Sequence, residues 1–480
     1  MASKYECIMW LEVHVKLNSP NKLFCQCKNE QNFDKLKPNT HVCPTCMGMP
    51  GWLPVLNQEP LEKAVLLGYA LNCDINKTSK FERKSYFYPD SPISYQITQL
   101  EKPTNVNWTV KFFTDNYNVE NEVRINRAHI EADAGKTIHD WPRGVLDFNR
   151  CSTPLVEIVT EPDFRSSEQV VEFLKELQRR IQLNNIGYAD LEKWQMRCDV
   201  NLSIRPKWSD EYGKRVEIKN MNSFGAIQKA IKNEYKRQLK LVKSWWSVDQ
   251  QTRWRNDEDS SSYVMRTKEE ELDYRYFPEP DLPPVKLEDE TLEKIQSQLK
   301  SSSFERIKRY KQEYNFNKEY INAVFQSTDV NEYFEDCISQ WANPTLAVKW
   351  ISSYINRFLN KNSADIQDLK FNQKQFVDFL SKLENDKLQR AQAKKVIKEM
   401  LNTGKNPEVI IKEKWLKPID KDKISSIVDE VIQENQSAIE DIQNGKQWAI
   451  GYLIGQVMQK SKWKANPKQA KKMLQDKINS

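Results

Sequence analysis

The stretch IMWLEVHVKL, residues 8–17, predicts a β-strand with two chemically different faces. Its apolar and polar side chains alternate, and successive side chains of a strand point to opposite faces of a sheet. Val13 and Val15 share one face, and Glu12 and His14 share the other. One surface therefore carries a carboxylate beside an imidazole. Taken alone, this pattern favours an ordinary solvated strand face.

Two later stretches repeat the alternation. In MRCDVNLSIRP, residues 196–206, and RVEIKN, residues 215–220, apolar side chains fill one face and polar side chains the other. The polar positions include Arg197, Asp199, Asn201, Glu217 and Lys219. Such faces suit an open phosphate- or metal-binding sheet, although a merely solvated antiparallel sheet gives the same pattern.

Three segments in the same half show helical periodicity: 61–71, 166–185 and 223–243. The second opens with Ser166 and Gln169 in the spacing of a capping box. Helices between strands predict an α+β class, with a domain built on an antiparallel sheet and flanking helices.

The second half of the chain is expected to be all-helical. The last 191 residues hold four prolines and four glycines, and their pattern is typical of consecutive helices. At the seam FPEPDLPPVKLED, residues 277–289, four prolines are expected to prevent regular structure. Further on, Gly404 is a candidate helix C-cap. We therefore predict an α+β domain over 1–289, a helical domain over 290–405 and a helical tail over 406–480.

Composition limits the class of protein. The 480 residues are 29% charged and 39% hydrophobic, with no apolar run of membrane-spanning length, which is typical of a soluble multidomain protein. The first ten residues show no basic region followed by an apolar core, so we expect no secretion signal and a cytoplasmic location. A net charge of +6 permits a polyanionic partner without requiring one.

Four of the nine cysteines form two close pairs, in FCQC and HVCPTC. They are Cys25, Cys27, Cys43 and Cys46, with 15 residues between the pairs. Two such pairs match the tetrahedral geometry of Zn2+, and four cysteine ligands close the coordination shell. We therefore predict a structural zinc that holds a loop and takes no part in catalysis.

Carboxylates recur in two further stretches. RINRAHIEADAGK carries Glu131, and LDFNRCSTPLVEIVTEPDF carries Glu157. With Glu12 and His14 they offer ligands of the kind that hold magnesium against the phosphates of a nucleotide. The chain has no GxxxxGK[ST] loop, which excludes a P-loop fold, so a nucleotide site would have to be built on the open sheet.

The order of the motifs resembles a known family, the GatB/GatE-type B subunits of aspartyl/glutamyl-tRNA amidotransferases. The motifs are LEVHVKLNSPNKLFCQC, PNTHVCPTCMGMPG, FERKSYFYPD, RAHIEADAGK, LDFNRCSTPLVEIVTEPD, MRCDVNLSIRP, RVEIKNMNSF and DYRYFPEPDLPP. The similarity runs from about residue 5 to GYLIGQVMQKSKWKANP near the end of the chain.

This resemblance implies an ATP-dependent, glutamine-hydrolysing carbon-nitrogen ligase. Such a protein binds tRNA(Gln) or tRNA(Asn) misacylated with glutamate or aspartate and activates the side-chain carboxylate with ATP as an acyl phosphate. Ammonia then forms the amide. It arrives through a tunnel from a separate amidase-like glutaminase subunit, and a third, small subunit holds the heterotrimer together. The implied cofactors are ATP, Mg2+ and the structural Zn2+.

The same resemblance implies residue roles in the first domain, which becomes the catalytic domain. Glu12, His14, Glu131 and Glu157 are the expected magnesium ligands and catalytic residues. Lys84, in FERKSYFYPD, is expected near the tunnel mouth, where a cation could orient the acyl phosphate. Arg197, Asp199, Asn201 and Lys219 are expected on the nucleotide or acceptor-end side of the pocket.

The end of the chain is basic. Residues 456–480 contain seven lysines and one acidic residue, which suits contact with tRNA phosphates. The tail over 406–480 is therefore expected to bind tRNA, although a basic helix in an orphan sequence is more often simply solvated. The alternative for the whole chain is a non-catalytic, zinc-stapled tRNA-binding module.

Six tryptophans stand where the family pattern has glycine: Trp10, Trp194, Trp245, Trp246, Trp415 and Trp463. The chain has 14 tryptophans and only 12 glycines, well under the roughly 7% glycine of an average protein. We hypothesise that the source organism reads UGA as glycine and that these codons were translated as tryptophan. The alternative is a fast-evolving chain that accepted the change. A second departure is Ala132, where many family members carry glutamate.

Overall fold

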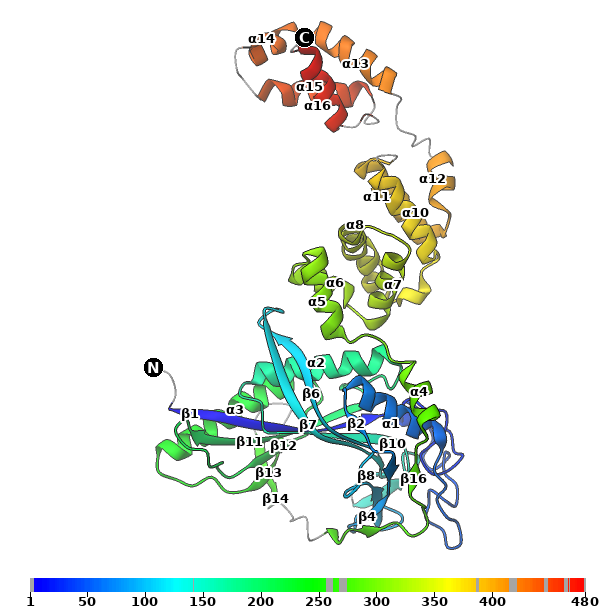
Figure 1. Cartoon of the computed structure of the whole chain (residues 1–480), viewed down its shortest axis with the longest axis vertical. Coiled ribbons are helices and arrows are strands. Elements are labelled where there is room, and N and C mark those ends of the chain that lie inside the picture. Colours follow the sequence, from blue (N-terminus) through cyan, green and yellow to red (C-terminus); the bar gives the residue numbers. More distant parts are fainter. Residues whose placement is uncertain are drawn as a thin grey trace. The chain divides into compact units, whose positions relative to one another are not determined.

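The computed structural model describes residues 4–140, 142–255, 262–266, 274–385, 388–413, 421–443, 448–461, 465 and 467–478. The chain forms two compact units, Met1–Arg309 and Tyr310–Ser480 (Figure 1). No helix in these ranges is long and apolar enough to cross a membrane. The expected further division of the helical half near residue 405 stays a prediction.

A nine-stranded sheet forms the centre of the first unit (Figure 1). Its strands, in order across the sheet, are β14 (Ser262–Arg266), β13 (Gln251–Arg255), β12 (Val216–Lys219), β11 (Met196–Pro206), β1 (Tyr5–Lys16), β10 (Pro154–Thr160), β7 (Val119–Ala132), β6 (Asn105–Thr114) and β2 (Asp74–Ile75). Neighbouring strands are antiparallel, except that β12 and β13 are parallel. The predicted strands are confirmed, and β1 begins a few residues earlier than expected.

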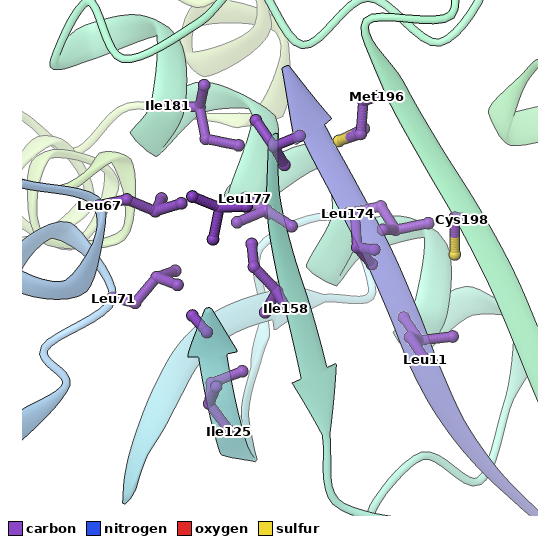
Figure 2. Packing of buried hydrophobic residues seen from close by; sticks show 14 of the residues in the cluster. Leu11, Leu67, Leu71, Ile125, Ile158, Leu174, Leu177, Ile181, Met196 and Cys198 are labelled. Atoms are coloured by element: carbon purple, nitrogen blue, oxygen red, sulfur yellow. The ribbon is translucent and has the colours of Figure 1, made fainter. Parts of the chain in front are cut away.

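Helices cover the apolar face of this sheet. They are α1 (Gln58–Ala70), α2 (Ser167–Leu183) and α3 (Phe224–Lys243). Figure 2 shows Leu174 and Leu177 of α2 packed beside Leu11 of β1 and Ile158 of β10. Each such buried side chain contributes roughly 1.5–3 kcal/mol, so the apolar positions hold the strands in one orientation. The polar positions of β1 and β11 are thereby placed on the opposite face.

The predicted N-terminus of α2 is confirmed. The Ser166 side chain accepts a hydrogen bond from the Gln169 backbone, and the Gln169 side chain accepts one in return from the backbone N–H of Ser166. This reciprocal capping box satisfies donors that the first turn of a helix leaves without partners.

The proline-rich seam contains two short strands, so the expectation of no regular structure there is wrong. β15 (Phe277–Pro278) pairs with β4 (Glu82–Ser85), and β16 (Val285–Lys286) pairs with β3 (Thr78–Ser79). β15 is at the edge of its small sheet, where a missing proline N–H needs no partner. Arg83 also donates to both carboxylate oxygens of Glu279 at 2.7 Å. The seam therefore belongs to the first unit.

The remaining short strands are β5 (Tyr95–Thr98), which pairs with β4, and the hairpin of β8 (Lys136–Asp140) and β9 (Arg143–Asp147). Three short helical segments are η1 (Phe33–Lys35), η3 (Ile351–Ile355) and η4 (Ile366–Asp368).

The regular elements that the structure describes after β16 are all helices, as predicted. The helices are α4 (Asp289–Gln296), α5 (Ser303–Tyr314), α6 (Lys318–Val324), α7 (Thr328–Ser339), α8 (Pro344–Trp350), α9 (Asn356–Asn362), α10 (Gln373–Glu384), α11 (Arg390–Thr403), α12 (Pro407–Glu413), α13 (Lys421–Glu434), α14 (Gln436–Gln443), α15 (Trp448–Lys460) and α16 (Pro467–Ile478). Gly404 ends α11 with a φ of 72°, which confirms it as the C-cap.

One tryptophan occupies the helix-ending position that usually belongs to glycine. Trp245 follows α3 with a φ of 64° and is 97% exposed. Its N–H donates to Val242 O at 3.2 Å, and the N–H of Trp246 donates to Leu241 O at 3.0 Å. This is the Schellman arrangement, in which the residue with positive φ is most often glycine because a Cβ atom is costly there.

Trp341 ends α7 in the same way, although the motifs did not single it out. Its φ is 66°, its side chain is 93% exposed, and its N–H donates to Ile338 O at 2.9 Å. Trp194 also has a positive φ, of 56°. Left-handed backbone at bulky residues is rare, so these three positions support the glycine hypothesis. Trp415 and Trp463 lie outside the described residues.

Candidate active site

Three predicted ligands meet on the polar face of the sheet, where β1, β10 and β7 run side by side. The register places His14 of β1 opposite Glu157 of β10. His14 Nε2 is 3.4 Å from Glu157 Oε2 and 3.1 Å from Glu131 Oε1 of β7. The ligand atoms of these three residues all lie within 4.8 Å of one another, which suits a single metal ion. We call them the histidine group.

The electrostatics of the histidine group favour a positive charge at its centre. Burial disfavours the imidazolium form of His14, but the Glu131 and Glu157 carboxylates outweigh burial and raise the pKa of His14 to about 10. Burial also opposes ionisation of Glu157, but His129 and His14 hold the pKa of Glu157 well below its ordinary value. A proton on His14 therefore occupies a place where a bound cation would be stabilised by the same carboxylates.

Lys84 adds a second positive charge beside the histidine group. Burial opposes that charge, but Tyr276, Glu157 and Glu131 outweigh burial and raise the pKa of Lys84 above its ordinary value. The Lys84 ammonium also lies 4.8 Å from the centre of the Tyr274 ring. Lys84 therefore stays charged near the carboxylates of the histidine group.

A second group of carboxylates lies on the same face, where β1, β11 and β12 are neighbours. Ligand atoms of Glu12, Asp199 and Glu217 lie within 4.8 Å of one another. Asn201 Nδ2 donates to Glu12 Oε1 at 3.0 Å, and Lys219 Nζ contacts Asp199 and lies 3.3 Å from Glu217 Oε1. Lys219 offsets part of the negative charge. We call Glu12, Asp199 and Glu217 the carboxylate group.

The four predicted zinc ligands converge. The Sγ atoms of Cys25, Cys27, Cys43 and Cys46 all lie within 4.8 Å of one another. Tetrahedral coordination by bonds of about 2.3 Å would separate the sulfur atoms by about 3.8 Å, so the arrangement suits Zn2+. A hydrogen bond from the Cys25 thiol lowers the pKa of Cys46 to about 5. The fully buried Lys22 also reaches Cys46 Sγ at 3.8 Å, so its ammonium can stabilise a thiolate.

Comparisons with known proteins agree with the motifs. A model of the GatB/GatE catalytic domain matches residues 7–293, and a model of the GatB domain matches residues 332–478. The chain is 42% identical to the B subunit of the aspartyl/glutamyl-tRNA(Asn/Gln) amidotransferase of Caldicellulosiruptor bescii, with 99% of each chain covered. The chain belongs to the GatB/GatE family.

Two further relatives of this GatB/GatE chain cover nearly its full length, and both are B subunits of aspartyl/glutamyl-tRNA(Asn/Gln) amidotransferases. The protein of Thermoanaerobacter pseudethanolicus is 39% identical over 99% of the chain and 100% of the relative. The protein of Carboxydothermus hydrogenoformans is 38% identical over 99% of each.

In this GatB/GatE chain the four expected magnesium ligands do not gather in one group, and their role as magnesium ligands stays a prediction. His14, Glu131 and Glu157 converge, whereas Glu12 joins the carboxylate group. Glu12 and His14 are two residues apart on one strand, and side chains at that spacing start about 6.6 Å apart. His14 therefore groups with side chains of β10 and β7, whereas Glu12 groups with side chains of β11 and β12.

The residues expected around the nucleotide divide between the two groups. Arg197 Nη2 donates to Asp133 Oδ1 at 3.3 Å, and Asp133 directly follows the end of β7, which carries Glu131 of the histidine group. Asp199, Asn201 and Lys219 instead belong to or contact the carboxylate group. The polar faces predicted for these strands of the GatB/GatE chain thus carry charged and polar side chains that form hydrogen bonds and ion pairs with one another.

Sequence reasoning did not assign a ligand role to Glu217 or any role to His129. Glu217 lies opposite Asn201 in the β11–β12 pairing, and His129 lies opposite Glu157, with its Nε2 atom 3.7 Å from Glu157 Oε2. The alternation in RVEIKN already put Glu217 on the polar face. His129 is two residues before Glu131, so the same alternation puts both on one face.

Part of the basic tail of the GatB/GatE chain is already paired. Lys460 Nζ is 2.5 Å from Glu434 Oε1, and Lys477 Nζ is 2.7 Å from Asp429 Oδ1. Lys471 and Lys472 of α16 are exposed. The lysines available to an external phosphate are therefore fewer than the sequence count suggests.

Proposed function

We propose that this chain is the B subunit of a tRNA-dependent amidotransferase, as the names of its relatives indicate. It would bind Glu-tRNA(Gln), Asp-tRNA(Asn) or both, activate the side-chain carboxylate with ATP, and convert it to the amide. The observation that carries the proposal is the convergence of His14, Glu131 and Glu157 beside the half-buried Lys84, on the polar face of a family member's sheet. A protein with only a structural zinc site would not require this arrangement of charged side chains.

The proposed reaction has two steps. A carboxylate oxygen of the aminoacyl group attacks the γ-phosphorus of ATP and ADP leaves; ammonia then attacks the acyl carbon and phosphate leaves. Positioning and charge neutralisation account for most of the catalysis in such phosphoryl transfers. The histidine group and the carboxylate group are the proposed Mg2+ sites, where the cation would supply charge neutralisation at the phosphates.

The chain's own side chains would orient the reactants. Lys84 holds a positive charge next to the histidine group and would attract the acyl phosphate. Arg197 donates a hydrogen bond to Asp133, which follows the strand of Glu131, so Arg197 would place a second cation near the histidine group. Lys219 and Asn201 hold the side chains of the carboxylate group by direct contacts, so they would fix the positions of ligands rather than react themselves.

The proposed partners follow from the same function. Ammonia requires a glutamine-hydrolysing, amidase-like subunit, and a third, small subunit would complete the heterotrimer. The four cysteines would bind a structural Zn2+, and the helical tail would contact tRNA through its exposed lysines.

The test is reconstitution of the heterotrimer with charged tRNA. We expect ATP-dependent formation of Gln-tRNA(Gln), Asn-tRNA(Asn) or both, measured by chromatography of the released amino acid, with one ADP formed per amide. The second candidate is a non-catalytic tRNA-binding module. The zinc cluster and the basic tail are equally consistent with that function. Tight tRNA binding without ADP formation or amide product would favour that alternative.

A further inference from the structure

Two aromatic side chains lie on the polar face of the sheet, on the two strands that follow the carboxylate group. Lys219 of β12 pairs with Trp254 of β13 in the parallel ladder, and Trp254 pairs with Tyr263 of β14 in the antiparallel ladder. Side chains of directly paired residues share one face of a sheet. Trp254 and Tyr263 therefore lie on the face that carries Lys219. We call these two residues the aromatic platform.

A hydrogen bond shows that this face is continuous with the carboxylate group. Thr252 pairs with Glu217, and Thr252 Oγ1 donates to Glu217 Oε2 at 2.8 Å. Trp254 is two residues after Thr252 on β13, so both side chains lie on the face of Glu217. Trp254 is half-buried, and Tyr263 is 55% exposed. A ligand can therefore reach the aromatic platform from the same side as the carboxylate group.

The spacing of the strands suits a nucleotide that lies across the sheet. Neighbouring strands are about 4.8 Å apart, and two residues along a strand span about 6.6 Å. The backbone of Trp254 therefore lies about 8 Å from the backbone of Glu217. The ribose and the α-phosphate of ATP bridge a gap of this order between the purine base and the β-phosphate. A nucleotide whose phosphates lie at the carboxylate group can thus place its base on Trp254.

The order of the strands gives the direction of the nucleotide. The carboxylate group, on β1, β11 and β12, lies between the aromatic platform and the histidine group, on β1, β10 and β7. In the proposed reaction the γ-phosphate meets the substrate carboxylate near the histidine group, where Lys84 would attract the acyl phosphate. The base at the other end of ATP then points toward β13 and β14, where the aromatic platform lies.

The chemistry of the platform suits a nucleobase. Aromatic side chains bind bases by stacking, because every base has a flat π-face. We propose that the aromatic platform binds the purine base of ATP, with Trp254 nearer to the phosphates than Tyr263. Both residues would position the nucleotide and take no part in making or breaking bonds. This inference rests on the proposed function and adds to it the site of the base.

The test compares a ligand that has a base with one that has none. Calorimetry measures binding of the non-hydrolysable ATP analogue AMP-PNP and of inorganic tripolyphosphate to the heterotrimer with Mg2+. Trp254→Leu should raise the Kd for AMP-PNP about tenfold, and Tyr263→Leu should raise it less, because each removes one stacking ring. The affinity for tripolyphosphate should stay within about twofold. Equal losses for both ligands would show that the rings support the phosphate site, and would overturn the proposal.

Kinetics with ammonium chloride as nitrogen donor separate ATP from the terminal adenosine of charged tRNA, which carries the same base. Trp254→Leu should raise the KM for ATP about tenfold and leave kcat and the KM for charged tRNA within about twofold. Trp254→Phe keeps an aromatic ring and should restore most of the affinity for ATP. A raised KM for charged tRNA with an unchanged KM for ATP would assign the platform to tRNA and overturn the proposal.

Val264 provides the matched control. It follows Tyr263 on β14, so its side chain lies on the opposite face of the sheet, and it is 53% exposed. Val264→Ala should leave the Kd for AMP-PNP and both KM values unchanged.

Unchanged affinity for AMP-PNP in both Trp254→Leu and Tyr263→Leu would also overturn the proposal. An unmodified heterotrimer that binds AMP-PNP but forms no amide would instead count against the proposed function. In that case calorimetry with the variants still decides whether the platform binds the base. An unmodified heterotrimer that binds no AMP-PNP would overturn both proposals.

Discussion

Glu12 lies directly opposite Asp199 in the antiparallel pairing of β1 with β11. Like charges at directly opposed positions repel each other and destabilise a sheet. Glu217 adds a third carboxylate, and the Lys219 ammonium offsets part of the charge. A bound cation would reduce the remaining repulsion among the three carboxylates. We therefore expect cation binding at the carboxylate group to raise the stability of the folded protein.

The first prediction concerns Glu12→Gln, which preserves size and removes one negative charge. The fold should survive, and the melting temperature without divalent cations should stay equal or rise because repulsion falls. ATP-dependent amidation should drop on the order of 100-fold, about 2.7 kcal/mol in the barrier. Binding of charged tRNA should stay unchanged. Glu6→Gln, on the same strand but paired with Arg205 at 2.8 Å, is the matched control. A normal amidation rate in Glu12→Gln would contradict the assignment.

The second prediction separates the two proposed metal sites. Mn2+, used as a spectroscopic substitute for Mg2+, should bind at both the histidine group and the carboxylate group. Glu131→Gln should abolish binding at the first, and Asp199→Asn should abolish binding at the second, because each removes an anionic ligand. Electron paramagnetic resonance titration counts the bound ions. Loss of all bound Mn2+ in either variant would point to one shared site.

The third prediction concerns the zinc loop. Cys43→Ser should lose bound zinc and lower the free energy of unfolding on the order of 4 kcal/mol, because metal ligation is coupled to folding. Lys22→Met should keep the four ligands but weaken zinc binding, because the buried ammonium next to Cys46 is lost. Zinc analysis and urea unfolding measure both effects. Thr40→Ser changes an exposed residue of the same loop and should alter neither the zinc content nor the free energy of unfolding. Full stability of a zinc-free protein would rule out a structural metal.

The fourth prediction concerns the helix end at Trp245. Trp245→Gly should raise the free energy of unfolding by roughly 0.5–1 kcal/mol, because glycine adopts the left-handed conformation without a Cβ penalty. Trp246 is also exposed, at 70%, but its φ is not positive. Trp246→Gly should therefore give no gain. Urea unfolding measures the free energy of unfolding of both variants. An equal change in the two variants would show that the backbone conformation at Trp245 carries no strain.

The hypothesis of recoded glycine has its own measurement. Peptides from the protein isolated from its source should carry glycine at positions 245 and 341, where the backbone is left-handed. Peptide mass spectrometry distinguishes the two residues directly. Tryptophan at both positions in the isolated protein would show that the chain accepts the bulky side chains.

Local pattern was sufficient for several elements of the first unit, although not for all of them. The alternation in MRCDVNLSIRP predicted a strand that the structure confirms as β11, because the two-residue period is a property of the backbone itself. The cysteine spacing likewise predicted a cluster that forms, since two short pairs constrain four ligands locally. The proline-rich seam was misjudged, because whether a proline lies at a sheet edge depends on distant strands.

The sequence by itself determined which side chains share the polar face: Glu12 and His14 on β1, Asp199 on β11, Glu217 on β12. Only the tertiary structure decided how they group. The register sets Glu12 against Asp199 and His14 against Glu157, and strand order brings Glu131 in from β7. Register depends on packing of the opposite, apolar face against α1, α2 and α3, which is a non-local property. The four side chains expected to share one site therefore lie in two groups.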